Sequence, residues 1–308
     1  FPINCCTWIK GIYGTVMEQG IGSVICVTNG DCSNTQMLME VLKLKGVNTI
    51  PFAYPDSPNL LHMQACLESL AKTLGANTED AEKVLMKLVS IRKLTRELDR
   101  LTWESNIVSG FENHYWHVSA SDFLGDASEY ESGLTRLLAQ CRTRKPYSDN
   151  MLRLAYIGVP SVFGRELYRF LERSGARVVF NEIQRQFAMP HNYSSLAEQY
   201  TGYTYPYSLS ERISDILPEL ERRRVDGVIH YVQAFCHRGI GDIVMRERIK
   251  LPMLTIEGNN EYNLTQHIKT RLEAFLDVVK HRRDKVRGYE TKTFAKSKGE
   301  SQIGMESN

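Results

Sequence analysis

The sequence predicts an α/β fold with two lobes, each built on a parallel sheet, joined by a helical segment. Three observations lead to this prediction. Short β-branched runs alternate with helical stretches at both ends of the chain, separated by loops of a few residues. The region between these ends contains mostly helical patterns. The length of 308 residues suits two domains, or one large domain with an insertion.

The first lobe is predicted to span residues 1–58, with an N-terminus that looks truncated. Residues 22–29, GSVICVTN, are typical of a buried parallel strand. The turn that follows leads into a helix that ends at Gly46, and residues 47–54 form the next predicted strand. Strand–helix–strand order with short loops implies a right-handed parallel crossover.

Residues 59–150 are predicted to form a mostly helical connecting segment. Its longest helical pattern begins with a predicted N-cap at Thr78 and, if continuous through Leu101, is about 35 Å long. The unusual stretch 112–123, ENHYWHVSASDF, fits two interpretations. A structural junction between the lobes is the favoured one, and a proton relay or a lid over the cleft is the alternative.

The second lobe is predicted to span residues 151–288 and repeats the alternation of the first. Its predicted strands are 152–160, 176–183, 226–235 and 251–258, and its predicted helices are 165–175, 210–224, 240–250 and 265–284. Residues 289–308 are polar, contain few large apolar side chains and are predicted to form a flexible tail.

The composition excludes several classes of function. The 42% hydrophobic and 24% charged residues are typical of a soluble globular protein. The 38 Lys and Arg residues nearly balance the 36 Asp and Glu residues, so no basic excess is available for nucleic-acid or lipid phosphates. No apolar run of about 18 residues and no signal peptide is present, and a cytoplasmic location is therefore expected.

Three of the seven cysteines occupy positions where parallel α/β folds place ligand sites. Cys32 and Cys236 each follow a predicted strand, and Cys6 precedes a predicted helix. Ligands gather at the carboxyl ends of parallel strands, and helix N-termini favour anionic sulfur. With no export signal, a disulfide framework is not expected. We therefore expect these three thiols to meet in one cleft.

The spacing of the cysteines indicates which metal would use them. Zinc sites usually contain CxxC pairs, and this sequence has none. Three thiolates without a paired fourth ligand suit an iron–sulfur cluster with one iron open to substrate. The alternative is that the cysteines are ordinary core residues. This alternative is preferred for Cys66, Cys141 and Cys26, whereas Cys5 is left undecided.

Two further polar residues are candidates for catalytic roles. His237 directly follows Cys236 and would donate to a cluster sulfide or to substrate, or else lie at the surface. Glu257 ends the last predicted strand and would act as a cleft-facing base, or else be an ordinary turn residue. His230 is expected to be a hydrogen-bonded core histidine. The sequence contains no P-loop, so ATP hydrolysis is expected from a separate protein.

Four stretches together resemble a known family. In order they are CCTWIKGIYG, VTNGDCSNTQMLMEVLKLKGVNTIPFAYP, DGVIHYVQAFCHRGIGDIVMRERIKLPMLTIEGN and TRLEAF. Their order and spacing resemble the D-component-like subunits of the 2-hydroxyacyl-CoA dehydratase and benzoyl-CoA reductase family, from Cys6 to about Val279. Two departures occur. The family's usual stretch before the first cysteine is absent, and GDCSNTQ replaces a TCDGKKK-like run.

The resemblance implies two Rossmann-like lobes and an oxygen-sensitive [4Fe–4S] cluster on Cys6, Cys32 and Cys236. It implies an anaerobic, radical-type lyase, or a related reductase, that passes single low-potential electrons to a CoA thioester. An acyl-CoA is the implied substrate. The implied protein partners are a related dehydratase subunit and a separate ATP-dependent iron–sulfur activator, with no role for nucleic acid or a membrane.

Three alternatives remain. One is a small-molecule reductase with a double-cubane [8Fe–9S] cluster, for which Cys5 and Cys26 would be the extra ligands. Another is a non-catalytic iron–sulfur scaffold for electron transfer or assembly. The last is a Rossmann-like sugar or nucleotide binder without iron. Iron content, the presence of a CoA-sized channel and the colour of the purified protein distinguish them.

Overall fold

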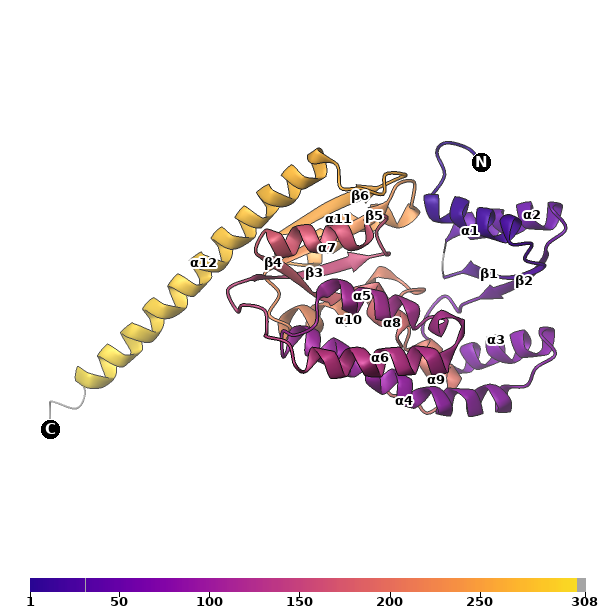
Figure 1. Cartoon of the computed structure of the whole chain (residues 1–308), viewed down its shortest axis with the longest axis horizontal. Helices are drawn as coiled ribbons and strands as arrows, with labels where there is room; N and C mark the ends of the chain where they lie inside the picture. The colour runs from indigo at the N-terminus through magenta and orange to yellow at the C-terminus, as the bar shows by residue number, and fades with distance from the viewer. Residues whose placement is uncertain (31, 304–308) are drawn as a thin grey trace.

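The computed structural model describes residues 1–30 and 32–303, and in them six strands form two parallel sheets among many helices. The predicted α/β class with parallel sheets is confirmed. Figure 1 shows the smaller sheet on one side of the molecule, the larger sheet in the middle, and a long C-terminal helix that projects from the body.

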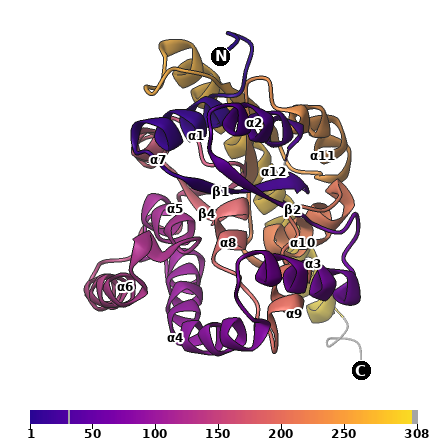
Figure 2. The same ribbon diagram turned by 90° about the vertical axis from the view of Figure 1, so that its right-hand side faces the viewer.

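The small sheet consists of β1 (Ser23–Asn29) and β2 (Asn48–Ala53), paired in parallel close to the predicted positions. Helices α1 (Thr7–Glu18) and α2 (Ser33–Leu44) cover one of its faces (Figure 2). The core under these helices is small. Its buried members are Cys6, Ile9, Val16, Leu38 and Leu42.

The segment between the two sheets is helical. It contains α3 (Leu60–Thr73), α4 (Thr78–Trp103), α5 (Gly110–Ser119), the short 3-10 helix η1 (Phe123–Gly125) and α6 (Ala127–Cys141). The predicted N-cap of α4 was wrong by one residue. Asn77, with extended backbone, is the cap, and its side chain accepts a hydrogen bond from the Asp80 N–H at 2.8 Å, whereas Thr78 is already helical.

The large sheet has the strand order β4-β3-β5-β6, and all neighbours are parallel. The strands are β3 (Leu152–Gly158), β4 (Ala176–Asn181), β5 (Gly227–Gln233) and β6 (Met253–Gly258). All seven residues of β5 are buried, which explains why this strand is recognisable as a continuous apolar run.

Helices cover both faces of the large sheet. One face packs on α7 (Gly164–Arg173) and α12 (Gln266–Ile303), and the other packs on α10 (Leu209–Arg222) and α11 (Asp242–Arg248). Three further short helices were not predicted. They are α8 (Glu182–Phe187), α9 (Leu196–Thr201) and the 3-10 helix η2 (His237–Gly241).

The last helix is longer than predicted. The pattern indicated an end near residue 284, but α12 continues to Ile303, through a stretch without proline and rich in good helix formers. Residues 289–303 of the predicted tail are thus traced as helix, and residues 304–308 lie outside the described residues. Within the described residues, no helix combines the length and the apolar character needed to cross a membrane.

Candidate functional site

The three cysteines singled out in the sequence each occupy an N-cap position. Cys6 caps α1, Cys32 caps α2 and Cys236 caps η2, and none of the three side chains makes a capping hydrogen bond. Cys6 is buried, and the other two are half-buried. The folded chain therefore places all three sulfur atoms beside the first N–H groups of a helix, where negative charge is stabilised.

The structure brings these cysteines together. Burial raises the pKa of the Cys6 thiol, the Ile9 and Trp8 N–H groups lower it, and negative charge on Cys236 and Cys32 raises it further. Charges in solution interact appreciably only within about 10 Å. Cys32, from the small lobe, and Cys236, from the large lobe, therefore both lie within this range of Cys6. No described group of three His, Cys, Asp or Glu side chains forms a ready-made site for a single metal ion.

Contacts to the loop after β6 hold Cys6 in place. The Thr7 hydroxyl donates to Asn260 Oδ1 at 2.7 Å and lies 3.3 Å from the Asn259 carbonyl oxygen. Tyr231, on β5, lies within electrostatic range of Cys6: burial raises its pKa to about 12, and negative charge on Cys6 adds to this shift. Tyr231 approaches the end of β6 closely, and a Cβ on Gly258 would lie 2.0 Å from its hydroxyl oxygen.

The turn before Cys32 is fixed by the large lobe. Gly30 has a φ of +89°, and a Cβ there would lie 2.7 Å from Pro206 Cβ and 2.9 Å from Tyr54 Cβ. Its carbonyl oxygen accepts a 2.8 Å hydrogen bond from Arg238 Nη2. The Arg238 guanidinium also lies over the Tyr205 ring at 4.4 Å. Only glycine allows the turn to pass so close to its neighbours.

A cleft of about 530 Å³ opens beside these residues, between the small and the large lobe. Cys32 and Gln36 line it from the small lobe, and Arg212, His237 and Arg238 line it from the large lobe. The Arg212 guanidinium donates two hydrogen bonds of 2.8 Å to Glu182, so its charge is compensated inside the protein. A smaller pocket of about 20 Å³ adjoins the cleft and reaches Cys236.

The two predicted catalytic residues are placed differently. His237 is exposed and lines the cleft beside Cys236. Glu257 is exposed at the carboxyl end of β6 and is absent from the described residues that line the cleft or the adjoining pocket. His237 can therefore contact a ligand in the cleft, whereas the lining of the cleft and of the adjoining pocket does not include Glu257 within the described residues.

In the described part of the chain, Cys32 lines the cleft and Cys236 lines the adjoining pocket, whereas Cys6 and the four remaining thiols line neither. Cys5 packs, half-buried, against the core that contains Cys6. Cys26 is buried within β1, and burial raises its pKa. Cys66 is half-buried on α3, and Cys141 is buried at the end of α6.

Two buried histidines have structural partners. His230 Nδ1 lies 2.6 Å from Asp242 Oδ1, as expected of a hydrogen-bonded core histidine. His114 Nδ1 lies 2.7 Å from the Tyr168 hydroxyl, which in turn donates to Asn181 Oδ1. These contacts tie α5 to α7 and β4. They favour the interpretation of residues 112–123 as a structural junction.

Sequence reasoning missed Gly30, Tyr231 and Arg238. Arg238 stands two residues after Cys236 and Gly30 stands two residues before Cys32, so proximity to a candidate thiol was the available signal. The pairing between them spans 208 positions and is visible only in the folded chain.

Residues 1–279 match the model of the family described as 2-hydroxyglutaryl-CoA dehydratase, D-component. No curated protein matches the chain. The matched region includes both sheets, the helical connecting segment and all three clustered cysteines. The resemblance noted in the sequence is thereby confirmed, and the chain belongs to the D-component family of 2-hydroxyglutaryl-CoA dehydratase.

Proposed function

We propose that this dehydratase-family subunit is the iron–sulfur component of a radical-type 2-hydroxyacyl-CoA dehydratase, with Cys6, Cys32 and Cys236 as ligands of a [4Fe–4S] cluster. The observation that supports this most strongly is the electrostatic proximity of Cys6 to Cys32, which lines the cleft, and to Cys236, which lines the adjoining pocket. Membership of the D-component family supports a dehydratase-type activity and a partner subunit.

The residues fit such a cluster. The cysteine ligands of a cubane bind different iron atoms, so they need not converge on one ion, in keeping with the lack of a single-ion site among the described residues. Negative charge on the other two thiols raises the pKa of Cys6 after burial, and bound iron would remove that repulsion. The N–H groups of Trp8 and Ile9 lower the pKa of Cys6. N–H groups beside a ligand sulfur also tune the reduction potential of an iron–sulfur cluster.

The protein side chains would bind and orient the substrate. When bound, the cluster would supply the single low-potential electron that makes loss of the 2-hydroxyl group from a CoA thioester accessible, a step that acid–base chemistry alone does not provide. The cleft is of a size to hold an acyl group and part of its pantetheine arm. His237 lies where it can hold or pass a proton to a ligand in the cleft. Tyr231 stays a neutral phenol, since its pKa is about 12.

Other components would complete the system. The sequence contains no P-loop, and we assign ATP hydrolysis and electron delivery to a separate iron–sulfur activator. Within the described residues the seven cysteines form no disulfide bond, which would suit a reducing cytoplasm.

Anaerobic purification with iron and sulfide quantification and EPR tests the proposal. We expect about four iron atoms per chain, and loss of most of this iron in Cys6→Ser, Cys32→Ser and Cys236→Ser. Cys66→Ser is the matched control, because Cys66 is half-buried on α3 outside the cleft lining. Full iron content in these three variants would show that Cys6, Cys32 and Cys236 are not cluster ligands.

The same preparation separates the alternatives. About eight iron atoms per chain, lowered by Cys5→Ser or Cys26→Ser, would identify a double-cubane reductase. Four iron atoms without binding of an acyl-CoA would identify an electron-transfer scaffold. Saturable acyl-CoA binding that His237→Ala weakens would support the dehydratase assignment.

A further inference from the structure

A second, larger pocket lies at the other end of the large sheet from the cysteines. Its volume is about 1080 Å³, and Met151, Asp226 and Leu251 line it just before or at the start of β3, β5 and β6. Cys236 follows the far end of β5. Because this strand has seven residues, the two sites are separated by about 23 Å of sheet.

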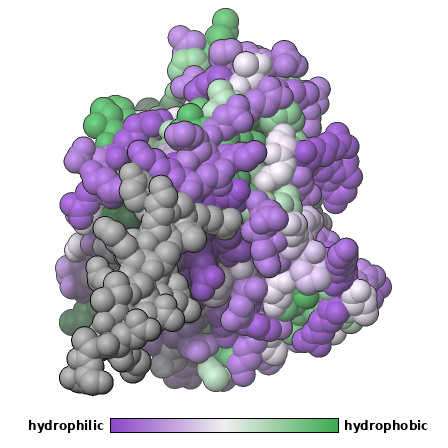
Figure 3. Space-filling view, turned by 90° about the vertical axis from the view of Figure 1, so that its left-hand side faces the viewer, coloured by the Kyte–Doolittle hydropathy of each residue, from purple (hydrophilic) through white to green (hydrophobic). Residues whose placement is uncertain are grey.

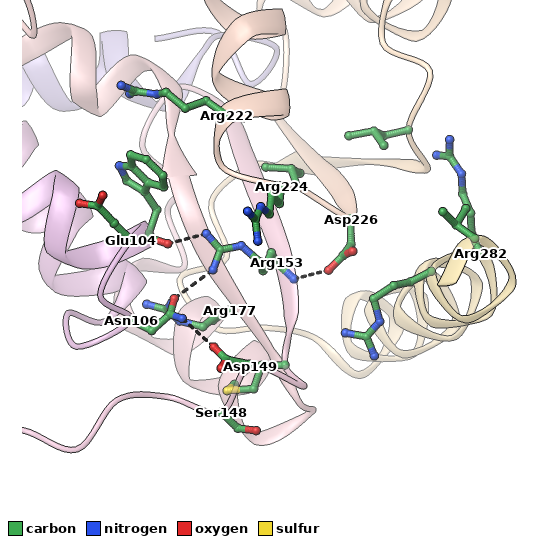
Figure 4. Close-up of a pocket in the computed structure, with 16 residues that line it drawn as sticks. Glu104, Asn106, Ser148, Asp149, Arg153, Arg177, Arg222, Arg224, Asp226 and Arg282 are labelled. Atoms are coloured by element: carbon green, nitrogen blue, oxygen red, sulfur yellow. Dashed lines mark hydrogen bonds between the residues drawn. The ribbon is translucent and has the colours of Figure 1, made fainter. Parts of the chain in front are cut away.

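Positive charge dominates the pocket. Six arginines line it against three carboxylates, an excess of three positive charges. The arginines are Arg153, Arg177, Arg222, Arg224, Arg282 and Arg283, and the carboxylates are Glu104, Asp149 and Asp226. Figure 4 shows Arg153, Arg224 and Asp226 on one side of the space and Arg282, from α12, on the other. The side of the molecule from which α12 projects is mainly hydrophilic (Figure 3).

Arg177 is buried without a carboxylate partner among the described residues. It is 1% exposed, and its guanidinium donates to Asn106 Oδ1 and to the carbonyl oxygens of Thr102 and Val108. Its Nε has no hydrogen-bond partner among the described residues. Burial of a cation whose hydrogen-bond acceptors are all neutral is costly, and here the charge of Glu172 and the Tyr147 ring, 4.6 Å from the guanidinium, offset part of the lost hydration. Burial accordingly lowers the pKa of Arg177 to about 10.

The guanidinium of Arg153 likewise donates hydrogen bonds to neutral acceptors. It donates to the Arg223 and Trp103 carbonyl oxygens at 2.8 and 2.6 Å, and to Asn106 Oδ1 at 3.0 Å. Arg283 adds a second buried Nε without a hydrogen-bond partner among the described residues, although this atom lies 3.7 Å from Asp284 Oδ1 in an ion pair. Two arginines at the rim, Arg224 and Arg282, are exposed and form no ion pair within the described residues.

The three carboxylates of the pocket accept hydrogen bonds, but none of these bonds comes from a guanidinium group of the pocket lining. Glu104 accepts a 2.6 Å hydrogen bond from Arg100, outside the pocket lining. Asp149 accepts from Asn106 at 3.1 Å, and Asp226 accepts from the backbone N–H of Arg153 at 2.8 Å. Within the described residues, four of the six guanidinium groups form no ion pair with a carboxylate, and an anionic ligand would provide that partner. They belong to Arg153, Arg177, Arg224 and Arg282, whereas Arg222 pairs with Glu219 and Arg283 lies 3.7 Å from Asp284.

We propose that this pocket binds a nucleoside polyphosphate, with its phosphates on the arginines and its ring on the apolar lining. Arginine is the side chain best suited to phosphate, because its planar donors bind two oxygens at once. Trp103, Val225, Leu251 and Val286 supply the apolar part of the wall. A ligand that is anionic at one end and apolar at the other matches this lining. The site is independent of the proposed dehydratase activity.

Calorimetric titration of the full chain with ADP, tripolyphosphate and adenosine tests the proposal. ADP is expected to bind saturably and more tightly than either fragment, with an affinity that falls as salt is raised. Arg224→Gln and Arg282→Gln are each expected to weaken ADP binding about tenfold, the effect of one lost charge-assisted hydrogen bond. The exposed Arg136 on α6 lies outside the pocket lining, and Arg136→Gln is the matched control.

Several results would overturn the inference. They are the absence of saturable ADP binding, equal affinities in the pocket variants and the control, and tripolyphosphate binding as tightly as ADP. The cleft is excluded as the binding site by Cys32→Ser, which is expected to bind ADP unchanged; lost binding in this variant would also overturn the inference. Both rim arginines are exposed, so circular dichroism of each variant verifies that the fold is intact.

Discussion

Replacing Gly30 with alanine tests how the turn before Cys32 is held. The backbone at this position has a φ of +89°, which L-residues rarely adopt. A Cβ would also lie 2.7 Å from Pro206 Cβ and 2.9 Å from Tyr54 Cβ. Both contact atoms are attached directly to backbone, so neither side chain relieves the overlap by changing rotamer. The turn itself has to move.

The expected loss in free energy of unfolding is the sum of the backbone strain and the steric overlap. Left-handed backbone costs an alanine about 1–2 kcal/mol, and overpacking adds about 1–3 kcal/mol, so Gly30→Ala should lower the free energy of unfolding by about 2–5 kcal/mol. Gly46 provides the control. Its φ is +80°, but a Cβ there meets nothing within 4 Å, so Gly46→Ala should cost only about 1–2 kcal/mol.

Urea unfolding followed by circular dichroism measures both costs, and iron quantification after anaerobic purification measures the effect on the thiols. Gly30→Ala is expected to lose more stability than Gly46→Ala and to hold less iron, because the displaced turn carries Cys32 with it. Equal losses of stability in the two variants would refute the packing argument. A destabilised Gly30→Ala with full iron content would show that the turn does not position Cys32.

Three further predictions concern stability. Arg223→Met should lower the free energy of unfolding by about 3–5 kcal/mol, because it leaves the buried Asp99 without its cationic partner. Arg222→Met, which removes a half-exposed ion pair with Glu219, should lower it by less than about 1 kcal/mol. Similar losses of stability for the two variants in urea unfolding would contradict this prediction. Burial lowers the pKa of His114 to about 3. The unfolded chain therefore takes up a proton below about pH 6.5 and the folded chain does not, so stability is full above that pH and falls towards pH 3. His114→Gln should reduce this slope by about 1.4 kcal/mol per pH unit in urea titrations at pH 6 and 5, and an unchanged slope would oppose the assignment. Arg238→Lys should speed hydrogen exchange in the turn before Cys32, since it removes the bond between the lobes, and unchanged exchange would show that this bond is dispensable.

The strands and the long helices could be predicted because apolar side chains mark them. Buried parallel strands appear as continuous apolar runs, and β5 is buried along its whole length. The helix α8 could not be found in this way. Its buried residues include Glu182, Arg185 and Gln186, which are satisfied by partners on α10 such as Asp215 and Arg212. A hydrophobic pattern carries no information on buried polar side chains that pair across elements.

The candidate site was predictable only in part. Cys32 and Cys236 each follow a strand that the sequence indicates, and Cys6 precedes an indicated helix, so their place in an α/β fold could be deduced. Contacts such as that from Thr7 to Asn260, 253 positions apart, could not be deduced from local pattern. Glu257 was assigned to the correct strand end but lies exposed there, because the alternation of faces in β6 does not by itself say which face meets the cleft.

The position of the thiols also follows from the size of the small lobe. Its sheet has two strands within the described residues, and a parallel pair of strands is not stable alone in water. Aromatic packing of Tyr54 against Tyr203 and Tyr207 anchors one face to the large lobe. Near the cysteines, hydrogen bonds from Thr7 to Asn260 and from Arg238 to Gly30 join the two lobes. A cluster on Cys6, Cys32 and Cys236 would add a covalent link between the lobes at this end, so that its binding would stabilise their association.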